Sequence, residues 1–149
     1  MKKSLLVALA LLIGGSLFAQ EYKQAAGIRI GGVVTATYKT FVSQTNALDF
    51  EAGIGFGNGM NICASGAYEW TWGLNVDGLS VYAGPGVTAS LFLGEAGGIS
   101  VGILGVAGIE YKIPSVPLVL SVDYKPTLNL IPNVAGGWSN GGLSIRYIF

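Results

Sequence analysis

Residues 62–72, ICASGAYEWTW, carry the pattern that decides how this chain folds. Apolar or aromatic side chains stand at nearly every second position from Ile62 to Trp72, and small or polar ones such as Ser65 and Glu69 stand between them. A period of two residues is that of a β-strand, whose successive side chains point to opposite faces. The stretch therefore predicts a strand with one apolar face and one polar face.

The same alternation returns along most of the chain, between clusters of Gly, Pro, Asn and Ser that are typical of turns. After the first twenty residues, no long window shows the 3.6-residue spacing of an amphipathic helix. We predict eight strands, at residues 24–31, 34–42, 47–57, 61–73, 79–92, 99–112, 117–130 and 140–149. The longest connection is expected around 131–140.

The charged side chains of these strands share one face. Pairs two residues apart, such as Glu110 and Lys112, stay on the same face whichever phase is chosen. Five basic and five acidic side chains balance one another in charge, which suits a closed interior where an unpaired charge is costly. The predicted interior ion network consists of Arg29, Lys39, Asp49, Glu51, Glu69, Glu110, Lys112, Asp123, Lys125 and Arg146.

Composition excludes several classes of protein. Of 149 residues, 51% are hydrophobic and only 11% are charged, against roughly 25% charged in soluble domains. Disorder and a basic nucleic-acid-binding patch are therefore excluded. The sequence has no histidine, which removes His-based triads and most zinc sites. We predict no catalytic residue, no metal site and no cofactor, and we interpret Cys63, the single cysteine, as a small inward-facing residue.

The apolar face fits a membrane better than a soluble core. A soluble sheet would need a charged surface, and few charges are left to form one. Because neighbouring strands alternate in direction, seven aromatic side chains of the apolar face map to one rim, as in a membrane-interface girdle. At the opposite rim only Phe56 and Trp138 are candidates. The predicted interface aromatics are Tyr38, Phe50, Trp70, Trp72, Tyr111 and Tyr147, with Phe149 at the same rim.

The N-terminus has the layout of a secretory signal peptide. Lys2 and Lys3 precede an apolar run, and a cleavage point follows at Ala19. The apolar run of about 16 residues is short for a transmembrane helix, which needs about 20. We therefore predict a signal peptide at 1–19, cleaved after Ala19, and a barrel domain at 20–149. Cleavage would leave six basic and eight acidic side chains.

The export signal, the eight alternating strands and the terminal run LSIRYIF at 143–149 together resemble small bacterial outer-membrane β-barrels of the OmpA/OmpX type. The resemblance implies an all-β fold, an eight-stranded antiparallel up-and-down transmembrane barrel. It also implies that Phe149, as the final aromatic residue, is read by the barrel-assembly machinery. Pro85 and Pro126 depart from the pattern, because each removes a hydrogen-bond donor within a predicted strand. We expect a bulge or a rim position at each.

The expected function is non-enzymatic: an integral outer-membrane protein with a structural or surface-interaction role. Its expected partners are outer-membrane lipid and the assembly machinery, with no nucleic acid and a surface partner that the sequence does not identify. Three alternatives stay open. They are a soluble exported barrel with its apolar face turned inward around a ligand, a narrow outer-membrane pore, and a lipid-modifying enzyme, which the lack of histidine disfavours.

Overall fold

The computed structural model describes residues 22–149, except 58, 95–96, 132–133 and 138–139. The predicted signal peptide at 1–19 and Trp138 lie outside the described residues. Within the described ranges the chain is all-β, and no helix there has the length and hydrophobicity needed to cross a bilayer.

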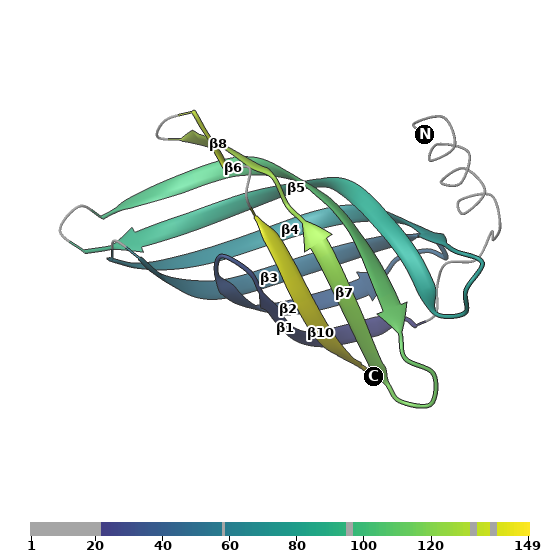
Figure 1. Cartoon of the computed structure of the whole chain (residues 1–149). Helices are drawn as coiled ribbons and strands as arrows, with labels where there is room; N and C mark the ends of the chain where they lie inside the picture. The colour runs from purple at the N-terminus through teal and green to yellow at the C-terminus, as the bar shows by residue number, and fades with distance from the viewer. Residues whose placement is uncertain (1–21, 58, 95–96, 132–133, 138–139) are drawn as a thin grey trace, which may run out of the picture.

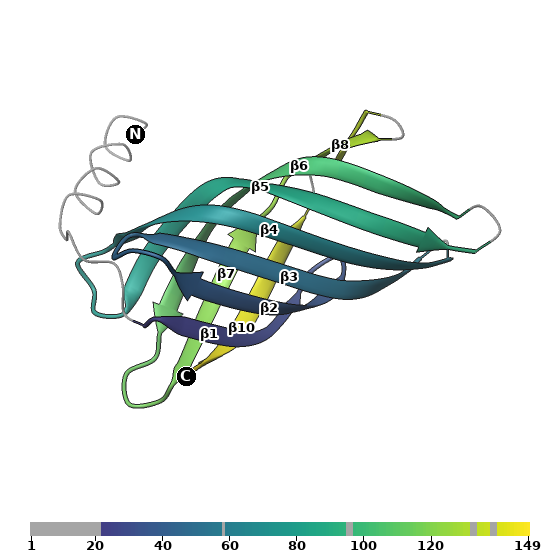
Figure 2. The same ribbon diagram turned by 180° about the vertical axis from the view of Figure 1, so that it is seen from behind.

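The described residues form ten strands, which make one antiparallel sheet (Figures 1 and 2). Eight of them close into a ring in the order β1-β2-β3-β4-β5-β6-β7-β10, with β10 pairing back to β1. This confirms the predicted eight-stranded up-and-down barrel. The bounds are β1 (Gln24–Ile30), β2 (Val34–Phe41), β3 (Asn46–Gly57), β4 (Gly59–Gly73), β5 (Leu79–Leu93), β6 (Gly98–Lys112), β7 (Leu118–Tyr124), β8 (Thr127–Ile131), β9 (Ala135–Gly137) and β10 (Gly141–Ile148).

Pro126 divides the predicted strand 117–130 into β7 and β8. The register with β6 is the same on both sides of the proline, Ala107 opposite Tyr124 and Leu104 opposite Thr127, and it shifts farther along β8, between Gly102 and Val101. Beyond the proline, β8 leaves β10 and pairs instead with β9. Part of the predicted 131–140 connection is therefore a short strand rather than a loop.

Pro85 lies in the middle of β5, so the predicted bulge or rim position is wrong for this residue. The β4–β5 pairs stop at Ala67–Gly86 and resume at Trp70–Ala83 in the same register. The neighbouring Gly84 allows a close approach here, because a Cβ at Gly84 would lie 1.8 Å from the carbonyl oxygen of Tyr68. The sheet therefore accommodates the missing donor by losing two pairs rather than by inserting a residue.

Burial is reversed relative to a soluble domain. Charged side chains such as Arg146 and Glu69 are at most 1% exposed, while Ile30 is 60% exposed and Phe56 82%. The predicted separation of polar and apolar faces is present, with the polar face inside. Two apolar clusters also face inward: Tyr22, Ala25, Phe41, Ala47 and Val119, and Ala67, Tyr82, Leu104 and Val106.

The barrel wall is uneven in height. The strands β4, β5 and β6 have 15 residues each, whereas β1 and β7 have seven. At about 3.3 Å per residue, the long strands extend roughly twice as far as the short ones. Figures 1 and 2 show β3 to β6 running past the β1–β2 turn on one side. The end that holds the C-terminus and the start of β1 is called the terminal rim below, and the other end the open rim.

Candidate functional site

The barrel interior holds the candidate site, a stack of ion pairs. Nearest the terminal rim, the Lys39 ammonium contacts Glu69 at 2.8 Å and Glu110 at 3.2 Å. Tyr22 donates a hydrogen bond to Glu110 at 3.1 Å. The ammonium also lies 4.1 Å from the centre of the Tyr82 ring, close enough for a cation–π contact. The Lys39 ion pairs, the Tyr82 ring and the Tyr22 hydroxyl together fill this end of the lumen.

Arg146 organises the middle of the stack. Its guanidinium donates to Thr37 at 3.1 Å, to Ser121 at 3.0 Å and to Asp49 at 3.2 Å. Thr37 in turn donates to Asp49 at 2.9 Å. Asp49 also lies 3.5 Å from the Lys125 ammonium, so one carboxylate serves two cations. These side chains come from β2, β3, β7 and β10, and they therefore connect opposite walls of the barrel.

Arg29 lies at the end of the stack nearest the open rim. It pairs with Asp123 through two nitrogens, at 2.6 and 3.0 Å. Lys125 pairs with Glu51, and Thr35 donates to the same carboxylate at 3.3 Å. Because an unpaired charge away from water is costly, each cation of the stack has a carboxylate partner from another strand.

Nine of the ten residues of the predicted network meet in this stack. Lys112 does not: it is half-buried near the terminal rim, and within the described part of the chain it has no ion pair. Four cations thus face five carboxylates, an excess of one negative charge. Lys112 is the last residue of β6, at the end next to the β6–β7 connection.

Sequence reasoning missed several polar members of the stack. Thr37 and Ser121 lie on the predicted inward face, yet nothing in the alternation marks one hydroxyl on that face as a partner of Arg146. Tyr22 precedes the first predicted strand, and Tyr82 stands in a strand whose Gly- and Pro-rich middle hides its faces. Only their contacts with Glu110 and Asp123 identify them.

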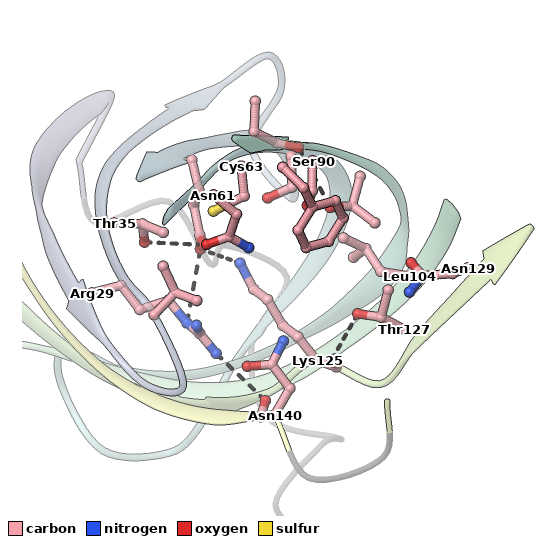
Figure 3. A pocket seen from close by; sticks show the side chains of 16 residues that line it. Arg29, Thr35, Asn61, Cys63, Ser90, Leu104, Lys125, Thr127, Asn129 and Asn140 are labelled. Carbon is pink, nitrogen blue, oxygen red and sulfur yellow. Dashed lines mark hydrogen bonds and ion pairs between the residues drawn. The ribbon is translucent and has the colours of Figure 1, made fainter. Parts of the chain in front are cut away.

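Above the stack, the lumen opens into a cavity of about 280 Å³ (Figure 3). Its floor is charged, with Arg29, Glu51 and Lys125, and its walls carry hydroxyl and amide groups. Cys63 lines the wall, half-buried, with its Sγ 3.6 Å from the carbonyl oxygen of Gly53. The remaining polar lining residues are Thr35, Asn61, Ser65, Thr88, Ser90, Thr127, Asn129 and Asn140.

The predicted interface aromatics lie on the outer surface near the terminal rim. Phe50, Trp70, Trp72, Tyr111 and Tyr147 are between 36% and 56% exposed. Tyr38 is half-buried and contacts the ring of Phe149, with the ring centres 6.3 Å apart. Tyr68 packs edge-on against Trp70 and thereby extends the row of rings.

Comparison with solved structures gives a neighbour for this arrangement. The N-terminal β-barrel domain of OprF from Pseudomonas aeruginosa superposes with a TM-score of 0.67 at 14% sequence identity, over 85% of this chain and 95% of that domain. The chain has the fold of that barrel domain. This agrees with the resemblance to OmpA-type barrels noted in the sequence. No protein-family model and no curated protein matches the sequence.

Proposed function

We propose that this protein is a non-enzymatic, integral outer-membrane β-barrel with a structural or surface-interaction role. The observation that carries the proposal is the reversal of burial: a closed barrel with paired charges inside and aliphatic side chains outside. In a bilayer every backbone polar group must be satisfied within the protein, and a closed barrel does this without helices. The shared fold with the OprF barrel domain supports the same conclusion.

A soluble exported barrel around an apolar ligand would need the opposite orientation of its faces. Here the apolar side chains form the outer surface: Ile28, Val122 and Leu143 are each more than half exposed. The lumen is lined instead by charges and hydroxyls. Monomeric soluble proteins rarely expose apolar patches beyond a few hundred Å². The outer surface therefore favours burial in lipid over solution in water.

A pore is disfavoured by the packing of the lumen. An eight-stranded barrel has an interior just wide enough for its side chains. The Arg146 layer fills the middle of the lumen and the Lys39 layer fills the section near the terminal rim, and both side chains are at most 1% exposed. In a planar bilayer the purified protein should therefore give no steady single-channel current, and a stable current would favour the pore instead.

An enzymatic role has little to act through. The sequence has no histidine, and among the described residues no three His, Cys, Asp or Glu side chains gather as a metal site. The inward carboxylates are held in ion pairs with Lys or Arg. The lipid profile of a deletion strain should therefore be unchanged, and a lost lipid modification would support the enzyme alternative.

Fractionation with a heat-modifiability gel tests the proposed location. We expect the protein in the outer-membrane fraction, with unboiled and boiled samples migrating differently because a closed barrel resists the detergent until it is heated. The mass of the purified protein tests the cleavage after Ala19. Recovery in the soluble periplasmic fraction, with no shift on boiling, would contradict the proposal.

A further inference from the structure

Three hollows of the barrel meet end to end at its low side. The polar cavity of the lumen and a second hollow of about 310 Å³ share Val33, Asn61 and Phe92 as lining residues. The second hollow shares Phe56 with a shallow groove on the outer surface. Among the described residues, these shared lining residues place the three hollows next to one another between the lumen and the exterior, and this series of hollows is called the path below. The path passes over the β1–β2 turn.

Uneven strand length explains why the path exists at this place. The last β2–β3 pair joins Val34 to Ile54, whereas β3 continues to Gly57 alongside β4. Above Ile54 the wall therefore has no β2 beside β3. The turn between β1 and β2 contains Gly31 and Gly32, and a Cβ built on Gly32 would meet no atom within 4 Å. The turn at Gly32 therefore borders open space.

Small residues also form the outer groove. On the exterior Ala36 of β2 is paired with Ala52 of β3, and the larger side chains of Ile28, Val34 and Ile54 surround them. The lining contributes almost no polar atoms. The groove is an apolar trough that starts beside Phe56, at the point where the path leaves the barrel.

The inner end of the path has the opposite chemistry. Arg29 and Lys125 lie beside the carboxylate of Glu51 on the floor of the cavity, so both signs of charge are presented together. The Phe92 ring stands at the mouth, 45% exposed. Cations suit a phosphate, and an aromatic face suits a quaternary ammonium group. A zwitterionic head matches this set better than a head with net charge.

We propose that this path binds a zwitterionic single-chain lipid drawn from the surrounding membrane, with its head in the lumen cavity and its alkyl chain in the outer groove. The inference rests on the proposed membrane location, because the chain end would otherwise lie in water. A single chain is specified to match this one groove, which adjoins the second hollow at Phe56. The path changes from polar in the lumen cavity to apolar in the outer groove, just as the lipid changes from its polar head to its alkyl chain.

Photocrosslinking in lipid nanodiscs tests the proposal. The full mature protein is reconstituted in phosphatidylcholine discs, heat modifiability is verified there, and lysophosphatidylcholine with a terminal diazirine is added and irradiated. We expect crosslinks in peptides covering 28–36 and 52–62, and competition by unlabelled lysophosphatidylcholine. Labelling spread evenly around the barrel would overturn the site, and stronger competition by lauric acid would overturn the zwitterionic head.

Two filling variants and a matched control sharpen the test. Ala52→Phe fills the outer groove, and Ser90→Phe fills the lumen cavity. Each should lower the specific crosslinking by about fivefold or more, the equivalent of losing one or two favourable contacts. Ala89→Phe adds the same ring on the exposed outer face, where its pairs are Ala64 and Val101, and should leave labelling unchanged.

The outcomes separate this inference from the proposed function. If the protein is heat-modifiable in the discs but labelling is equal in the unmodified protein and its three variants, the lipid path is refuted and the membrane barrel is not. A protein that does not enter the discs in heat-modifiable form refutes both.

Discussion

Replacing Asp49 by Asn should destabilise the barrel strongly although the side chain keeps its shape. Asp49 accepts hydrogen bonds from Arg146 and Thr37 and lies 3.5 Å from Lys125. Among the described residues it is the only carboxylate within 4 Å of Arg146, which is 1% exposed. Removing one partner of a buried ion pair leaves an uncompensated charge, at a cost of about 3–5 kcal/mol. We therefore expect the free energy of unfolding to fall by that amount.

Glu69→Gln is the matched control. Glu69 is equally buried, but its ion pair is with Lys39, which keeps Glu110 as a second partner. The interior carries one more carboxylate than cations, so either variant equalises the number of charges, and the two variants differ only in the pairing that is lost. We expect a change of less than about 1 kcal/mol.

Urea unfolding of both variants in lipid vesicles, followed by tryptophan fluorescence and by the gel shift, gives the comparison. The reasoning is refuted if Asp49→Asn loses no more stability than Glu69→Gln, because the specific pairing of charges would then not matter.

Three further predictions address the wall and the rims. Gly84→Ala should lower the free energy of unfolding by about 1–3 kcal/mol, because the added Cβ overlaps backbone, while Gly32→Ala should leave it unchanged; equal denaturation midpoints would contradict this. Trp72→Ala removes a half-exposed ring at the terminal rim, and should cost about 1–2 kcal/mol in vesicles; no loss would argue against an interface girdle there. Phe149→Ala should reduce the fraction of the protein that reaches the heat-modifiable form in cells yet leave refolding of the purified protein into vesicles intact. Unchanged assembly in cells would argue against recognition of the last residue.

The fold was largely predictable because alternation is a local property. In residues 62–72 the polarity of each side chain shows which face of the strand it is on. The charged side chains of neighbouring strands then have to lie on the same side of the sheet. The eight strands of the closed ring and their antiparallel order followed from the turns, whereas the division of 117–130 and the short strand β9 did not. The strand break at Pro126 was not predicted: a bulge or a rim position was expected there, because the missing donor must be accommodated somewhere.

The parts that failed depend on contacts between distant strands. Nothing local distinguishes Lys112, which has no ion pair among the described residues, from Lys125, which has two carboxylates within 4 Å. Whether each lysine forms an ion pair depends on whether a carboxylate of the opposite strands lies at the same level of the barrel. The sheet likewise accommodates Pro85 because the neighbouring Gly84 has no side chain and can approach the backbone of Tyr68 in β4. Such effects need the register, which a single sequence does not contain.

The pairing of β1 with β10 has a consequence for synthesis. Six residue pairs, from Ala25–Ile148 to Ile30–Leu143, join segments that are more than a hundred residues apart. Until β10 has been made, both β1 and β7 present unpaired edges that can template aggregation. Contacts between such distant segments are also slow to form, because the closure entropy is lost before any contact compensates for it. The nascent chain must therefore remain unfolded, or be held by another protein, until its last strand is available to close the ring.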